Sequence, residues 1–246
     1  MVLCLAILVI GCNKNSDVTQ VVPGQKGEIK LNFTNMVGAD PIILNSQSYT
    51  NFNGDTFYVN TFNYYISNIQ FTRMDDSIVR EENSYHLIEA DKPQTFSFNC
   101  KRIPFGQYKS ITFTIGVDSL RNVSGAQSGA LDPVHNMFWS WSSGYLFTKL
   151  EGTSPQSPSG NIAFHIAGFS GPYNSLKTVT LNFPYNAIVS NYIKPVVKLK
   201  ADILEMFVNP STIKFGIVNN VTTVGALAKS MADNYADMFS VIEIEN

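Results

Sequence analysis

The chain has 246 residues, of which 44% are hydrophobic, 12% aromatic and only 15% charged. With 17 Lys and Arg against 19 Asp and Glu, its net charge of −2 argues against a nucleic-acid-binding protein, which needs a basic surface. The hydrophobic fraction excludes wholesale disorder, and the length fits one large β-rich domain or two small domains.

The N-terminus has the features of an export signal. It carries no charge over its first twelve positions, and its apolar run is too short for a membrane-spanning helix, which needs about 20 residues. The run ends in Val9-Ile-Gly-Cys12, which resembles a bacterial lipobox. We therefore predict a lipoprotein signal peptide at residues 1–11, lipidation at Cys12 and a polar tether at residues 12–26. The alternative is that the apolar run forms a buried N-terminal strand.

The cysteines agree with export and lipidation. Cys4 would be removed with the signal peptide and Cys12 would carry the lipid, which leaves Cys100 alone. The mature domain then has no internal disulfide. Cys100 is either a small buried residue or a soft metal ligand.

From residue 27 onward, β-branched and aromatic residues alternate with polar ones, which is typical of half-buried strands. Turn signals such as Asn53-Gly54 separate the alternating segments. The predicted strands are residues 28–33, 57–71 (one long strand or two joined by a bend), 85–88, 95–98, 108–117, 137–150, 161–166, 178–183 and 196–207.

One helix is predicted near the C-terminus, with Thr222 or Thr223 as its cap. Its apolar face consists of Leu227, Met231, Tyr235 and Met238. Nine strands, one terminal helix and no alternation of strands with helices predict an antiparallel β-sandwich, as a single domain over residues 27–246. The polar, Gly- and Ser-rich residues 118–133 are predicted to form a long loop, and such loops are often functional.

Catalytic signatures are missing from the sequence. It contains no GxSxG, GxxxxGK[ST], HExxH or CxxC pattern, and three histidines with one mature cysteine exclude a Cys₂His₂ zinc site. A Ser/His/Asp triad is compatible with the composition, but no strained nucleophile turn marks one. We therefore expect a binding protein and not an enzyme.

Two of the three histidines, His86 and His165, lie within strand-like alternation and have apolar neighbours. Each is either a hydrogen-bonded core residue or a ligand that meets the other across the sandwich. Two imidazoles suit Cu(I) in a near-linear arrangement. His135 lies in a polar loop and is expected to be exposed to solvent.

Both tryptophans, Trp139 and Trp141, stand two residues apart, so on a strand they share one face. They either pack at a seam of the sandwich or line a site in which an indole is oxidised. Carboxylates are available in or near the same loops from Asp118, Asp132 and Glu151. A DxDxDG run is missing, so a calcium site there is only weakly indicated.

A set of motifs resembles the MbnP-like family over about residues 27–210. In chain order they are YYISNI (64–69), YHLI (85–88), GVD (116–118) followed by Asn122, GALDP (129–133), MFWSWSSGY (137–145), LEG (150–152) and FHIAG (164–168). The resemblance implies a β-rich protein of the periplasm or cell surface associated with copper acquisition.

In relatives from methane-oxidising bacteria, two histidines and a kynurenine made from tryptophan bind Cu(I), and a di-haem partner enzyme of the MauG type makes the kynurenine. The resemblance implies His86 and His165 as the histidine pair here. This chain has Ser84 where the oxidised tryptophan is expected, so any kynurenine would come from Trp139 or Trp141. Phe138 and Ala167 also stand where the family tends to have Tyr and Gly.

The sequence therefore predicts a lipid-anchored protein of a Gram-negative cell envelope, on the outer membrane or facing the periplasm, that binds Cu(I) through His86 and His165 for metal acquisition or handling. Asp118, Asp132 and Glu151 are predicted to support the site. The alternative is a metal-free surface module that binds a glycan or another envelope protein, which would suit the low charge and the many aromatic residues.

Overall fold

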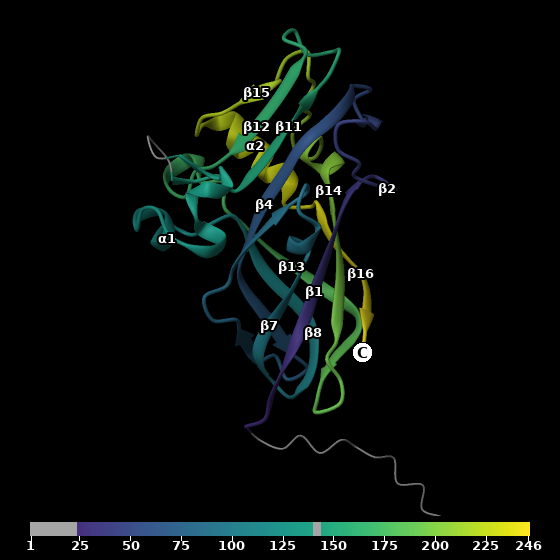
Figure 1. The fold of residues 1–246 in the computed structure, drawn as a ribbon, viewed down its shortest axis with the longest axis vertical. Helices are drawn as coiled ribbons and strands as arrows, with labels where there is room; N and C mark the ends of the chain where they lie inside the picture. Colours follow the sequence, from purple (N-terminus) through teal and green to yellow (C-terminus); the bar gives the residue numbers. More distant parts are fainter. Residues whose placement is uncertain (1–23, 140–143) are drawn as a thin grey trace, which may run out of the picture.

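The computed structural model describes residues 24–139 and 144–246, and most of its strands form two packed sheets (Figure 1). Cys12, the signal peptide and Trp141 lie outside the described residues. In the part of the chain that is described, no helix is both long and apolar enough to cross a membrane.

The smaller sheet has the order β16-β14-β1-β2, with β7 also paired to β1. Its central strand β1 runs parallel to β14 and antiparallel to β7. The last strand of the chain, β16, is antiparallel to β14. The bounds of these strands are Lys26–Val37 (β1), Asp40–Pro41 (β2), Ser97–Pro104 (β7), Val196–Asp202 (β14) and Phe239–Glu245 (β16).

The larger sheet has the order β13-β8-β4-β11-β12-β15, and β3, β5 and β6 pair with β4 as well. The long strand β4 is therefore its organising element. The bounds are Ser48–Thr50 (β3), Thr56–Arg73 (β4), Ile78–Arg80 (β5), Tyr85–Glu89 (β6), Gly106–Ile115 (β8), Thr148–Thr153 (β11), Asn161–Ile166 (β12), Lys177–Val189 (β13) and Asn220–Val221 (β15).

Two hydrophobic clusters cover the two faces of the larger sheet. The main core lies between the sheets, where Phe239 of β16 packs edge-on against Phe113 of β8 with ring centroids 5.1 Å apart. A second, smaller cluster lies on the outer face of the larger sheet and includes Tyr65, Leu87 and Phe147. The segment between β8 and β11 covers this outer cluster, so the predicted functional loop packs on the sheet (Figure 1).

That covering segment is built from short elements. They are α1 (Ser119–Val123), the 3₁₀ turns η2 (Gly129–Leu131) and η3 (Pro133–His135), and the two-stranded pair β9 (Phe138–Trp139) and β10 (Gly144–Tyr145). The prediction of one long strand over residues 137–150 was wrong for this reason. The N–H of Leu146 donates to the carbonyl of Met137, which extends the pairing of β9 with β10 before β11 begins.

The β-sandwich class is confirmed, but two of the strand pairs, β1 with β14 and β12 with β15, are parallel. Alternation within a strand does not distinguish the two directions, because side chains point to alternate faces in both. The predicted strand 196–207 also ends early. Asp202 accepts a hydrogen bond from the N–H of Leu204 and caps the 3₁₀ turn η5 (Ile203–Phe207).

The C-terminal helix is α2 (Ala226–Tyr235), and α1 is a second, short helix within the loop region. The N-cap residue of α2 is Gly225, so the prediction of Thr222 or Thr223 as the cap was wrong. Leu227 is half exposed, whereas Ala228 lies on the buried face beside Met231.

Candidate functional site

The strand register places a row of polar residues across four strands of the larger sheet. His165 of β12 pairs with Lys149 of β11, Lys149 with Asn63 of β4, and Asn63 with Glu89 of β6. Side chains at paired positions point to the same face of a sheet. The whole row therefore lies on the outer face, which the loop region covers, and its ends are roughly 14 Å apart at the backbone, since neighbouring strands lie about 4.8 Å apart.

His86 lies on the opposite face. It pairs with Ile66, which belongs to the main core, whereas Glu89 stands three residues further along the same strand. An odd separation within a regular strand puts two side chains on opposite faces. The structure therefore does not bring His86 and His165 together, and in this geometry the two rings do not fit around one copper ion.

His165 is a partly buried imidazole held by a carboxylate. Its Nε2 lies 2.7 Å from Oε1 of Glu151, whose carboxylate is also 3.4 Å from the Lys149 ammonium. Burial lowers the pKa of His165, and the Glu151 carboxylate opposes this only in part. The ring is therefore neutral near pH 7. An Nε2–H donated to Glu151 leaves Nδ1 as the basic nitrogen, the usual arrangement of a ligand histidine oriented by a carboxylate.

His86 is held in the same way at the edge of the main core. Its Nε2 lies 2.9 Å from Oε2 of Glu81, and its ring stacks on Phe98 with centroids 3.6 Å apart. Ser84 donates its hydroxyl to the same carboxylate over 2.6 Å. Although burial opposes it, the hydrogen bonds from His86 and Ser84 lower the pKa of Glu81. Ser84 thus has a structural role at the position where the resemblance leads one to expect an oxidised tryptophan.

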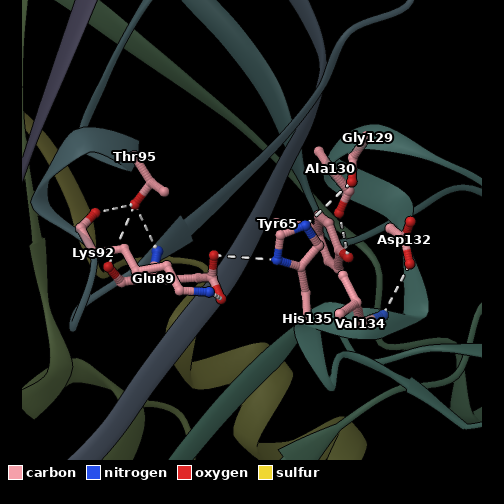
Figure 2. Close-up of polar contacts among 9 residues, drawn as sticks. All are labelled: Tyr65, Glu89, Lys92, Thr95, Gly129, Ala130, Asp132, Val134 and His135. Carbon is pink, nitrogen blue, oxygen red and sulfur yellow. Dashed lines mark hydrogen bonds and ion pairs between the residues drawn. The ribbon is translucent and has the colours of Figure 1, made fainter.

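His135 is not the exposed loop residue that the sequence indicates. Its side chain is 25% exposed, and Figure 2 shows it facing the buried carboxylate of Glu89. Its Nε2 donates to the carbonyl of Gly129 over 3.2 Å, and its Nδ1 lies 3.3 Å from Oε2 of Glu89. The other carboxylate oxygen of Glu89 accepts from the Lys92 ammonium over 2.8 Å.

Of the three predicted carboxylates, only Glu151 contacts a predicted ligand. Asp118 caps α1 and accepts the hydroxyl proton of Tyr85 over 2.6 Å. Asp132 caps η3 through the N–H of Val134. Asp118 and Asp132 therefore hold the loop region in shape, and this is a structural role.

Trp139 is half-buried beside the outer hydrophobic cluster, and its indole centroid lies 6.4 Å from that of the His165 ring. The motif tryptophan and the motif histidine, which are 26 residues apart in the sequence, thus come together on the outer face. Throughout the described ranges, no three His, Cys, Asp or Glu side chains are grouped as a metal site. Cys100 is fully buried, and burial together with the nearby Glu81 raises the pKa of its thiol.

Glu81 and Glu89, the carboxylates that contact two of the histidines, were not predicted from the sequence. Glu81 lies just before a predicted strand and Glu89 just after it, and nothing in their spacing distinguishes them from surface charges. The only available signal was their distance in sequence from His86, which is five residues for Glu81 and three for Glu89. Glu89 contacts His135 only because β6 lies beneath the loop region.

Comparison with known proteins agrees with the motifs. The chain resembles the solved structure of MbnP from Methylosinus trichosporium with a TM-score of 0.57 and 12% identity, over 82% of this chain and 83% of that one. At this identity the likeness concerns the fold alone. No curated protein matches significantly. The profile of the MbnP family matches residues 26–225, which is most of the chain. The protein therefore belongs to the MbnP family.

Proposed function

We propose that this protein captures Cu(I) as cargo in the cell envelope, with His165 as the histidine that donates to the metal. Family membership supports a copper-related role. The observation that carries the assignment to His165 is its environment, a partly buried neutral imidazole oriented by Glu151 and adjacent to Trp139. A neutral imidazole is the form that binds a metal, so no proton has to be displaced first.

His86, the second histidine of the predicted pair, faces the other side of the same sheet. A mononuclear site with both histidines would require a shift of one residue in the pairing of β6 or β12, which would turn every core side chain of that strand outward. We therefore propose that His86 acts separately, with its stacking on Phe98 and its bond to Glu81 as its main role.

In this role the protein binds and holds Cu(I) without catalysing a reaction, because metal binding requires only side chains that coordinate the ion. We also propose Cys12 as a lipid anchor in the envelope of a Gram-negative bacterium and Trp139 or Trp141 as the indole that a MauG-type di-haem enzyme oxidises to kynurenine. Peptide mass spectrometry of protein from its native host tests both modifications, because acylation and kynurenine formation each change a peptide mass.

The test of copper binding is a Cu(I) titration against a competing chromophoric chelator. His165→Gln and His86→Gln form a matched pair, because each removes an imidazole that is hydrogen-bonded to a glutamate. We expect His165→Gln to weaken Cu(I) binding by about tenfold or more, and His86→Gln to leave it within about twofold. Equal losses of affinity in the two variants would contradict the assignment to His165 alone and would support a site with both histidines. Unchanged affinity in both variants would show that neither histidine binds copper.

A further inference from the structure

A second polar site lies at the other end of the polar row, around Glu89 and His135. A cavity of about 220 Å³ opens there, and its lining includes Asn63, Glu89, Asp91, Lys92, His135 and Lys149. Glu89 and His135 also line a second hollow of about 280 Å³. The pair is therefore shared by two hollows.

Two buried polar atoms in this cavity wall have no hydrogen-bond partner. One is Nδ1 of His135, and the other is Oδ1 of Asn63, a residue that is only 7% exposed. A buried polar atom without a partner costs free energy, so a water molecule or an ion is expected beside each of these atoms. His135 Nδ1 lies 3.3 Å from the Glu89 carboxylate, which is itself almost fully buried, and Asn63 pairs with Glu89 across the strands.

The sheet register brings the Asn63 amide to Glu89. Ala90 donates its N–H to the carbonyl of Phe62, so in the alternating antiparallel pattern Asn63 and Glu89 form the next, non-hydrogen-bonded pair. Side chains of such pairs are the closest in a sheet, with Cβ atoms about 5 Å apart. At that Cβ spacing, the amide oxygen of Asn63 and the carboxylate of Glu89 can both reach one cation.

The contact between His135 and Glu89 has the geometry of two ligands. Nδ1 and Oε2 are 3.3 Å apart, yet the ring nitrogen does not point at the oxygen well enough for a hydrogen bond. Because Nε2 donates to Gly129, Nδ1 carries the lone pair in the neutral ring. Two ligands that bind one tetrahedral ion at about 2.0–2.1 Å are themselves about 3.3 Å apart, with each lone pair directed off the line between them.

We infer that Nδ1 of His135, Oε2 of Glu89 and Oδ1 of Asn63 form a binding site for a divalent transition-metal ion such as Zn(II), with water completing the coordination. One imidazole and two oxygen ligands favour a borderline divalent ion over Cu(I), which prefers softer ligands. The site is independent of the proposed Cu(I) site at His165. Lys92 engages only Oε1 of Glu89, which leaves Oε2 for the ion.

The cavity is lined by both acidic and basic side chains, so the charge of a lysine there can be removed to test metal binding. Asp91 and Glu89 are balanced by Lys92 and Lys149, and the Lys149 ammonium lies 3.4 Å from Glu151. The ammonium group of Lys92, which is bound to Glu89, therefore repels a cation in the site. Removing that charge should strengthen metal binding, whereas removing a ligand should weaken it.

The experiment is calorimetric titration of Zn(II) into the purified full-length chain, with Co(II) absorption as a report of coordination geometry. We expect one equivalent to bind at this site. His135→Gln and Glu89→Gln should each weaken binding at least tenfold, Lys92→Gln should tighten it several-fold, and the control His86→Gln should change it less than twofold. In NMR spectra, Zn(II) should shift the ring signals of His135 and leave those of His165 unchanged.

Unchanged Zn(II) affinity in His135→Gln, or weaker binding in Lys92→Gln, would overturn the site. Glu89 is buried, so its variant is judged only if its circular dichroism matches that of the parent protein. His135 and Lys92 are partly exposed, and their opposite expected effects decide the question without Glu89. Loss of Cu(I) binding at His165 with Zn(II) binding retained would separate this inference from the proposed function.

Discussion

His86 and His165 project from opposite faces of one β-sheet, although both lie in strands that flank the same two central strands. The relation follows from the odd separation of three positions between His86 and Glu89, since Glu89 shares its face with His165. The outer face therefore carries His135 and His165, and the inner face carries His86. At one end of the polar row, His165 is hydrogen-bonded to Glu151. At the other end, His135 of the loop region faces Glu89.

The stability of the protein should depend on pH through His165. Its folded-state pKa is lower than the ordinary value of about 6.5, so between the two values the unfolded chain binds more protons. The free energy of unfolding should therefore rise with pH through this window. The contribution of the neutral His165 ring should be complete above about pH 6.5 and should be lost as the pH falls below that value. Urea denaturation at pH 5.0, 6.0 and 7.5 measures this. In His165→Gln this part of the slope should disappear, and an identical slope would contradict the assignment.

Tyr85 should contribute to stability through its hydroxyl group. It donates to Asp118 over 2.6 Å, and burial together with that carboxylate raises the pKa of Tyr85 to about 12, so the proton stays on the phenol. Tyr85→Phe should lower the free energy of unfolding by about 1.5–3 kcal/mol, the range for a hydrogen bond to a charged group. Tyr192→Phe is the control because Tyr192 is 93% exposed. Similar effects of both changes in chemical denaturation would contradict this role.

Gly152 of the LEG motif should be irreplaceable for reasons of packing. A Cβ atom there would lie 2.0 Å from the backbone oxygen of Tyr58, at the irregularity where β11 pairs with β4. Gly152→Ala should therefore destabilise the sheet by several kcal/mol or prevent folding. Gly216→Ala should be tolerated, because its Cβ would meet only one atom, at an ordinary 3.5 Å. Thermal unfolding of the two variants gives the comparison.

Asn122 should hold the loop region on the outer face. Its Oδ1 accepts the N–H of Tyr145 over 2.8 Å, and its Nδ2 donates to the carbonyls of Val117 and Asp118. Asn122→Ala leaves the N–H of Tyr145 and the carbonyl of Val117 without these partners and should cost about 3 kcal/mol. Asn186→Ala, which removes an exposed hydrogen bond to Gln107, should cost less than about 0.5 kcal/mol. Limited proteolysis should cut the Asn122 variant within residues 118–145 first.

The alternation of residues was enough to predict where most strands lie, because a half-buried strand must alternate. Residues 161–166 coincide with β12, and residues 57–71 lie within the single long strand β4. The faces of the histidines could not be predicted in the same way. They depend on three successive registers, from β12 to β11, β4 and β6, and each register is set by packing between distant segments.

The loop region was harder to predict because its structure depends on side-chain caps. The sequence indicated that residues 118–133 matter, and it named Asp118 and Asp132 as site residues. In the structure both carboxylates accept backbone N–H groups at helix starts. Such capping is common for aspartate, so an aspartate in a loop does not by itself indicate a metal ligand. The pairing of His135 with Glu89 has no local sequence signal, since 46 residues separate them.

The pairing of β1 with β14 has a consequence for how the chain matures. Lys30 stands opposite Val196, so the first strand finds this neighbour only after 166 further residues have been made, and β16 comes later still. Contacts at such sequence separations form slowly, because a long loop must close first. During synthesis, the edge of β1 that later pairs with β14 therefore remains unpaired, and a chaperone that shields this edge should raise the yield of native protein more than one that acts on the C-terminal half.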